Sequence, residues 1–402
     1  MSNEIPIEID IQHNITNEQT HEETVPQTEI ACVNVFDISY GIFYAKYMLH
    51  NLPCSIKNMS NNWKCSKEWI VEDRINYDYF IQEYGDLDAP VADCDQINFN
   101  AQCKCNMKVK DYMSYLRTQY KEKLLYLKDW HLKRLTNELF YDVPILFASD
   151  WLNEYALDNK EDDFMFVYIG PKDTWTPLHA DVYSSYSWSV NVIGRKKWIM
   201  LPPGEEVKLR DAFGNLPLLF DPKIHKNVKY FEIIQERGDG IFVPSGWHHQ
   251  VFNVLDTISI NHNFINACNV EFVWRALQEN LVSVEKEIKE FQGTPDFTPQ
   301  CQLILKSVFG MDFASFIKFI VHIAQKRINH LDGKLCKLFN TYSLQKNHVI
   351  FDLYIILKII NFVENQPLKS SVILQSLLHN LCHGLLYIYI HHVVHSLLIL
   401  HI

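Results

Sequence analysis

Three side chains in this sequence have the types and spacing of a metal site. His179 and Asp181 are separated by one residue, and His249 follows seventy residues after the first histidine. On a β-strand, residues two apart point to the same face, so an imidazole and a carboxylate at this spacing can reach one common point. Two imidazoles and one carboxylate form the facial triad that binds Fe(II) and leaves other positions open for chemistry with O2. The sequence therefore predicts a metal site of His179, Asp181 and His249, although His-x-Asp alone is a weak motif in a chain with 18 histidines.

A lysine follows at a position from which it could reach the same cavity. Gly194 marks a tight turn, and Lys196 opens an apolar run that reads as the next strand. A lysine on the inner face of that strand would hold an anionic cosubstrate as a point charge. Because side chains alternate along a strand, its neighbour Lys197 is expected to face outward.

The motifs around these residues resemble those of one enzyme family. They lie between Tyr126 and Phe264 and read WTPLHAD, SYSW, GRKKW, PPG, FVPSGWHHQVFN and DTISINHNF. They are similar to the motifs of the jumonji C (JmjC) family of Fe(II)- and 2-oxoglutarate-dependent oxygenases, whose double-stranded β-helix carries His-x-Asp and a later His. The resemblance is strongest to a subgroup that hydroxylates a lysine of the eukaryotic peptide-chain release factor. It implies Fe(II), 2-oxoglutarate and O2 as cofactor and cosubstrates, with succinate and CO2 as products.

The resemblance also implies roles for single residues around the metal. Lys196 would pair with the distal carboxylate of 2-oxoglutarate, and Thr176 would donate a hydrogen bond to the same group. Tyr126, in a Leu-Tyr-Leu setting, would share that role, and Asn263 would contact the cosubstrate. For Tyr126 an ordinary core tyrosine, and for Asn263 a strand-capping asparagine, stay open as alternatives.

Two adjacent histidines, His248 and His249, compete for the place of the second imidazole. Neighbours on a strand face opposite ways, so only one of them can point inward. In the JmjC family the ligand is the last residue of a Gly-Trp-Trp-His-like run, and that residue is His249 here. We therefore expect His249 to bind the metal and His248 to face away from it.

The predicted fold is mainly β with α additions, a double-stranded β-helix of the cupin-like jelly-roll type. Short strands separated by turns are typical of a barrel or jelly roll. Candidate strands lie at 186–192, 196–201, 229–234, 240–244, 247–253 and 257–264. Four regions are expected, namely an acidic disordered tail (1–30), α/β elements that pack on the barrel (31–150), the JmjC core (151–268) and a helical region (269–402).

Periodicity and turn signals predict further elements outside the core. Helices are expected at 36–52, 108–125, 272–292, 310–330 and 347–363, and a loop with a short edge strand at 83–95. The C-terminal helices are also expected to offer a homodimer interface. The stretch 370–402 contains no charged residue and is open to three interpretations: a buried helix, a membrane anchor, which is disfavoured, or an incorrect C-terminus.

Composition limits the kinds of binding partner and the cellular compartments that are expected for this protein. The net charge of −11 argues against direct binding to nucleic acid, which needs a basic surface. None of the ten cysteines forms a Cys-x-x-Cys pair, so a structural zinc site is not expected. Without a recognisable secretory signal, these cysteines are typical of free thiols in a reducing compartment, the cytosol or the nucleus.

Three functions compete on this evidence. The first is a protein hydroxylase, with the translation release factor as the suspected substrate. The second is a demethylase of N-methyl-lysine in histones or other proteins, which uses the same chemistry but is disfavoured because no zinc-finger reader segment is evident. The third is a catalytically inactive barrel that acts as a binding scaffold, which is disfavoured because all three candidate ligands and Lys196 are present.

Overall fold

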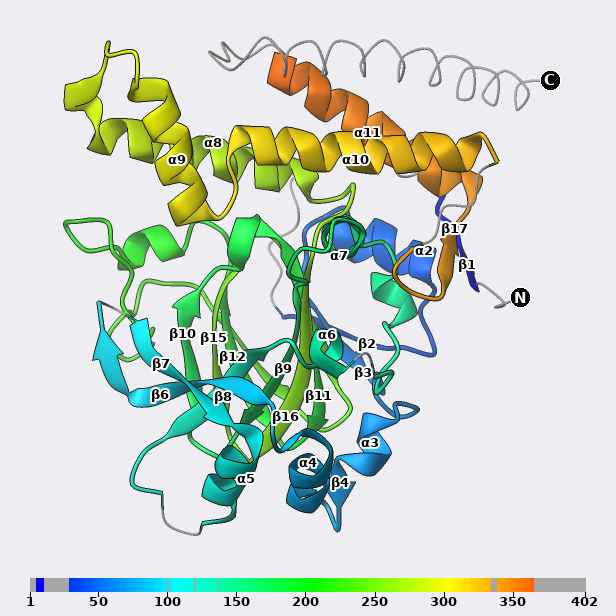
Figure 1. Ribbon diagram of the computed structural model, residues 1–402, viewed down its shortest axis with the longest axis vertical. Helices are drawn as coiled ribbons and strands as arrows, with labels where there is room; N and C mark the ends of the chain where they lie inside the picture. The colour runs from blue at the N-terminus through cyan, green and yellow to red at the C-terminus, as the bar shows by residue number, and fades with distance from the viewer. Residues whose placement is uncertain are drawn as a thin grey trace.

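Two facing β-sheets and a layer of helices make up the molecule (Figure 1). The computed structural model describes residues 5–10, 29–99, 101–118, 121–136, 138–333 and 338–364. The cavity described below is lined by strands of both sheets, as in a jelly roll. The prediction of a jelly-roll β core with helical additions is confirmed.

The smaller sheet has four strands in the order β10-β15-β12-β13. Their bounds are Trp175–His179 (β10), His248–Asn253 (β15), Lys196–Leu201 (β12) and Phe231–Gln235 (β13). All neighbours pair antiparallel, and Met200 of β12 lies opposite His249 of β15. His179, the last residue of β10, pairs with His249 near the start of β15, so the two histidines lie side by side.

The larger sheet has nine strands in the order β2-β3-β14-β11-β16-β9-β8-β6-β7. Their bounds are Ala31–Asn34 (β2), Cys54–Lys57 (β3), Gly240–Val243 (β14), Tyr186–Ile193 (β11), Thr257–Phe264 (β16), Met165–Gly170 (β9), Leu125–Trp130 (β8), Asp88–Asn98 (β6) and Ala101–Lys108 (β7). Every residue of β11 is buried, as expected of a strand covered on both faces. The strands predicted from 186 to 264 are confirmed.

Helices form a layer across one end of the barrel, at the top of Figure 1. They are α8 (Val270–Glu287), α9 (Phe297–Phe309), α10 (Phe313–Leu331) and α11 (Lys346–Glu364). Gly310 ends α9 in the left-handed conformation, and the Asp312 side chain then caps α10 by accepting a hydrogen bond from the amide of Ser315. The helices predicted at 272–292, 310–330 and 347–363 are confirmed within a few residues, whereas α9 was not predicted.

A buried ionic cluster joins this layer to the barrel. Arg327 of α10 is fully buried and forms a bidentate pair with Glu154 of α7 (Trp151–Asp158), at 3.0 and 2.9 Å. Its Nε donates to Asp352 of α11 at 2.6 Å. On the barrel side, the Asn153 amide donates to the backbone oxygen of Asn263 in β16. The helical layer is thus connected by charge and hydrogen bonds to a strand that lines the cavity.

Two predictions for the N-terminal half are wrong. The helix expected over 108–125 is confined to Val109–Arg117 (α5), because its buried stripe ends at Leu116 and the chain then enters β8. The loop and edge strand expected over 83–95 is instead β6, which pairs with β7 on one side and β8 on the other. Pro90 is tolerated because the ladder with β8 begins only at Val91.

The extreme N-terminus also differs from its prediction. Ile5–Ile7 (β1) pairs in parallel with Tyr342–Leu344 (β17), so part of the expected disordered tail 1–30 is folded, with Ile7 buried. The helix expected over 36–52 is shorter, and consists of Tyr40–Phe43 (α2) followed by one π-helical turn.

One C-terminal prediction cannot be compared with the structure, because the uncharged stretch 370–402 lies outside the described residues. Among the helices that the structure describes, none has the length and apolarity needed to cross a membrane.

Candidate functional site

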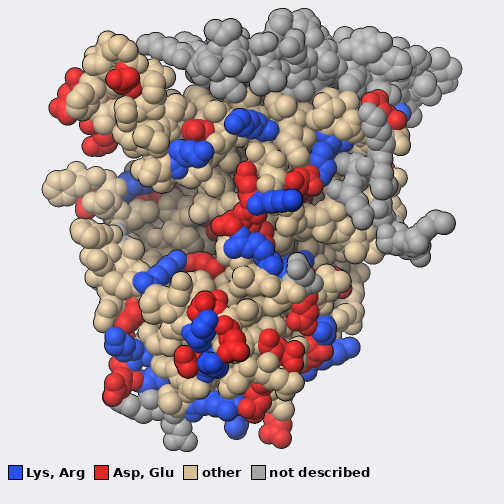
Figure 2. Space-filling model, in the orientation of Figure 1, with Lys and Arg blue, Asp and Glu red and all other residues tan. Residues whose placement is uncertain are grey.

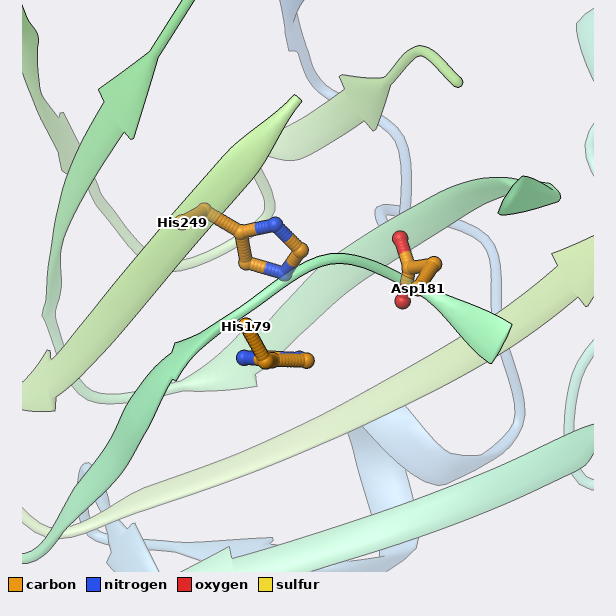
Figure 3. Close-up of side chains that lie close together, drawn as sticks. All are labelled: His179, Asp181 and His249. Atoms are coloured by element: carbon orange, nitrogen blue, oxygen red, sulfur yellow. The ribbon is translucent and has the colours of Figure 1, made fainter. Parts of the chain in front are cut away.

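The structure brings His179, Asp181 and His249 together. Their potential ligand atoms all lie within 4.8 Å of one another. Figure 3 shows the three side chains pointing into one shared space, the histidines from β10 and β15 and the aspartate from the segment after β10. The imidazole rings of His179 and His249 are 4.3 Å apart between centroids. A single ion could contact all three side chains.

Backbone carbonyls set the orientation of both imidazoles. His179 Nδ1 lies 2.8 Å from the oxygen of Pro177, and His249 Nδ1 lies 3.1 Å from the oxygen of Trp247. A carbonyl oxygen can only accept, so Nδ1 of each ring donates, and in the neutral form of such a ring the lone pair lies on Nε2. This is the tautomer that a metal-binding histidine needs.

Burial keeps His249 uncharged. Desolvation, followed by the nearby His179 ring, lowers the pKa of His249 to about 4. The Trp198 ring stacks on the same imidazole, with centroids 5.5 Å apart. At neutral pH, His249 is therefore a neutral ligand that needs to release no proton to bind a metal.

Asp181 lies outside the strand that was expected to carry it. Strand β10 ends at His179, and Asp181 instead precedes a 3₁₀ turn, η3 (Val182–Ser184). The register between β10 and β15 also shifts between Thr176 and His179. Strand alternation alone therefore does not place the carboxylate. One of its oxygens, Oδ2, accepts a hydrogen bond from the Ser187 hydroxyl at 2.6 Å.

Lys196 is a buried lysine that lines the same cavity as the three candidate ligands. It is 2% exposed, and its Nζ donates to Ser259 Oγ at 2.7 Å and to Tyr126 Oη at 3.3 Å. Desolvation lowers its pKa to about 7, and no carboxylate among the described residues offsets this effect. Lys197, as expected, faces outward and pairs with Glu232. A buried lysine without an anion is chemically suited to receive one.

All seven residues singled out in the sequence line one cavity. Besides the three candidate metal ligands and Lys196, these are Thr176, Tyr126 and Asn263. Tyr126 is 2% exposed, and Asn263 donates its amide to Ser185 Oγ at 3.1 Å. Placement in the cavity makes Tyr126 and Asn263 available to a ligand there.

Five further lining residues were not predicted, namely Tyr168, Ser187, Trp198, Val251 and Asn261. Alternation along β12 and β15 could have found Trp198 and Val251, since they lie two residues beyond Lys196 and His249. The other three come from the larger sheet, and no local motif marks them.

His248 does not take part in the cluster. It faces the opposite side of β15, where its Nδ1 lies 3.8 Å from Glu206. The geometry thus separates the two adjacent histidines as the alternation argument predicts, with only His249 reaching His179 and Asp181.

Comparison with known proteins agrees with this geometry. Residues 41–269 match the family model described as a cupin-like domain. The 2-oxoglutarate and iron-dependent oxygenase JMJD4 homolog of Drosophila melanogaster is 38% identical, over 90% of this chain and 94% of that protein. The 2-oxoglutarate and iron-dependent oxygenase JMJD4 of Danio rerio is 42% identical, over 82% and 85% respectively. The arginine-specific demethylase JMJ20 of Arabidopsis thaliana is 37% identical, over 73% and 69%.

The donor set and these similarities lead to the same conclusion. Two imidazoles, one carboxylate and a buried lysine are the groups that an iron ion and a dianionic 2-oxo acid require. The protein is an enzyme that uses Fe(II), 2-oxoglutarate and O2. The chain belongs to the JmjC family of 2-oxoglutarate- and iron-dependent oxygenases, in the group that includes JMJD4.

Proposed function

We propose that His179, Asp181 and His249 hold the iron and that Lys196 binds the distal carboxylate of 2-oxoglutarate. The observation that carries this proposal is that one cavity holds both a three-ligand cluster and a buried lysine with no carboxylate partner among the described residues. Thr176 and Tyr126 line the same cavity and would add hydroxyl groups for the same carboxylate. Iron and 2-oxoglutarate together supply the oxidising power that inserts one oxygen atom of O2 into a C–H bond.

The residues of this chain prepare the site in three ways. The carbonyls of Pro177 and Trp247 accept hydrogen bonds from Nδ1 of the two imidazoles, so that Nε2 is the atom of each ring that faces the metal position. Ser187 holds one oxygen of Asp181, which leaves the other free for the metal. Burial around Lys196 excludes water, so the attraction between its ammonium group and a bound carboxylate is strong.

Lys196 must also hold its proton when the cosubstrate binds. Its pKa of about 7 means that a large share of the molecules carry a neutral amine at neutral pH. A bound dianion favours the ammonium form and raises this pKa again. Binding of 2-oxoglutarate above pH 7 is therefore coupled to the uptake of a proton at Lys196 Nζ.

For the substrate, we propose a lysine side chain of the eukaryotic translation release factor. The support is the resemblance of the motifs from Thr176 to Phe264 to lysyl hydroxylases of that factor, together with the similarity to JMJD4 proteins. Figure 2 shows the surface hollowed on the left of the view, between the helical layer and the barrel. A folded protein substrate needs an open approach of this kind, and we place the target segment there.

Mass spectrometry tests this proposal directly. The release factor is incubated with the full chain, Fe(II), 2-oxoglutarate and air, beside an Asp181→Ala control. We expect one added oxygen atom on a lysine, with no addition in the control. Succinate formation without a modified release factor would show that the site consumes 2-oxoglutarate but does not hydroxylate this factor, and the substrate proposal would then be wrong.

A second candidate function, protein demethylation, is favoured by one comparison. A relative at 37% identity is named an arginine-specific demethylase, and oxidation of an N-methyl group needs the same site. The same experiment separates the two functions when methylated histone peptides are included. Loss of a methyl group with release of formaldehyde would identify a demethylase, whereas an added oxygen that stays on the lysine would identify a hydroxylase.

A further inference from the structure

We propose that Tyr183 and Gly310 form a contact through which the helical layer positions Asp181. This inference rests on the proposed metal site, because it assigns Tyr183 as a positioning residue for one of the three ligands. Tyr183 lies two residues after Asp181, in the turn η3, and Gly310 ends helix α9. The two residues are distant in sequence and meet only in the folded chain.

The turn that carries Asp181 has an unusual backbone. Tyr183 and Ser184 have φ angles of 58° and 54°, in the left-handed region that residues with a side chain rarely adopt. The turn begins at Asp181, whose backbone oxygen accepts a hydrogen bond from the amide of Ser184 at 3.2 Å. Two consecutive residues in this region persist only where surrounding contacts hold them.

Aromatic contacts from other elements hold the Tyr183 ring. Phe164, just before β9, and Phe309, the last residue of α9, each pack against it edge to face, with centroids 5.6 and 5.7 Å away. The backbone oxygen of Ser184 accepts from the Ser245 hydroxyl. Contacts from both the barrel and the helical layer thus hold the turn in place.

Gly310 provides the surface on which this ring rests. A Cβ atom at Gly310 would lie 2.9 Å from Cε1 and 3.0 Å from Oη of Tyr183, closer than such contacts normally are. Only a residue without a side chain permits this approach. Gly293, in the turn before α9, has a similar φ of 93° but no atom within 4 Å of its Cβ position. Replacement of Gly293 by alanine would therefore strain the backbone as at Gly310, but the new methyl group would contact no other residue.

The position of Asp181 makes this contact relevant to the metal. Because β10 ends at His179, no strand pairing fixes the backbone at Asp181. Its side chain is restrained by Ser187, and its backbone by the turn that contains Tyr183 and is closed by the amide of Ser184. A displaced Tyr183 ring would move the turn and hence the carboxylate, while the two histidines on paired strands would stay in place.

The test is the affinity of the purified full chain for Mn(II), a stable substitute for Fe(II), followed by electron paramagnetic resonance. We expect Gly310→Ala to weaken binding roughly tenfold, equivalent to about 1.4 kcal/mol, because its methyl group drives the ring away. Gly293→Ala should bind as the unchanged protein does. Tyr183→Phe should retain the affinity, and Tyr183→Ser should lose it to a similar degree.

A double variant and a melting measurement make the result decisive. If the contact acts through the ring, Gly310→Ala combined with Tyr183→Ser should bind no more weakly than Tyr183→Ser alone. Equal Mn(II) affinity in Gly310→Ala and Gly293→Ala, at comparable melting temperatures, would overturn the inference. An Asp181→Ala variant serves as the reference: if it still binds Mn(II) fully, the proposed metal site is wrong, and the positioning role falls with it.

Discussion

Replacement of Lys196 by methionine should separate stability from cosubstrate binding. Methionine matches the length of the lysine stem but carries no charge. In the folded chain Lys196 is 2% exposed, has no carboxylate partner among the described residues and has its pKa lowered to about 7. Without ligand, the protein therefore carries a charge that is buried away from water, and the methionine variant removes this charge. We expect Lys196→Met to be more stable without ligand and unable to bind 2-oxoglutarate well.

The magnitude follows from the pKa and the hydrogen bonds. Lowering the pKa of Lys196 from 10.5 to about 7 corresponds to roughly 5 kcal/mol. The variant also loses the bonds to Ser259 and Tyr126, worth about 1 kcal/mol each. A net gain of about 3 kcal/mol then remains below pH 7. Loss of the cation leaves the bound carboxylate unpaired, which costs about 3–5 kcal/mol, or at least ~100-fold in affinity.

The sign of the pH dependence follows from proton binding. The unfolded chain keeps the Lys196 proton up to its ordinary pKa of 10.5, whereas the folded chain releases it near 7. Between these values unfolding takes up a proton, so the stability of the unchanged protein rises with pH. The advantage of Lys196→Met should thus be full below pH 7 and shrink steadily toward pH 10.5.

Melting temperatures at several pH values and titration calorimetry with 2-oxoglutarate provide the assay. Lys197→Met is the matched control, because Lys197 faces outward on the same strand and pairs with Glu232. It should alter neither quantity appreciably. Calorimetry in buffers of different ionisation enthalpy should show proton uptake by the unchanged protein above pH 7. A Lys196→Met variant that is destabilised at pH 6.5, or that binds 2-oxoglutarate normally, would refute the reasoning.

Two further substitutions test neighbouring features. Arg327→Met should lower the free energy of unfolding by about 3–5 kcal/mol, since it removes the buried charge that joins Glu154 to Asp352 and leaves Lys326 as the remaining cation at Glu154; an unchanged urea midpoint would show that the cluster contributes little. Tyr126→Phe should weaken 2-oxoglutarate binding by about 2- to 10-fold in titration calorimetry, the loss expected for one hydrogen bond, and unchanged affinity would exclude its hydroxyl as a contact.

The inward and outward orientations of adjacent residues could be read from the sequence. Lys196 and Lys197, like His248 and His249, separate onto opposite faces as strand alternation requires. This rule is local, depending only on extended backbone, and the barrel strands extend as predicted. Strand alternation does not explain why the spacing of His179 and Asp181 was informative, because β10 ends at His179 and the aspartate lies beyond it.

Local patterns failed where pairing with a distant segment decided the structure. The sequence of β6 contains Pro90 and turn-forming residues, yet the strand is paired along both edges. Helix α5 stops at Arg117 although the apolar pattern continues to Leu124, and the chain is back in the larger sheet from Leu125, where β8 begins. In both cases partners in the larger sheet outweigh the local preference.

The sequence by itself determined the chemistry of this protein: the ligand types, the lysine, the β-rich core and the family to which they belong. Only the tertiary structure decided how these groups are supported. No local motif marks Arg327 or Tyr183, yet folding buries the first between two carboxylates and packs the second against Gly310. Strand and helix periodicities report which face a residue takes, whereas the partner on that face depends on contacts between segments far apart in the chain.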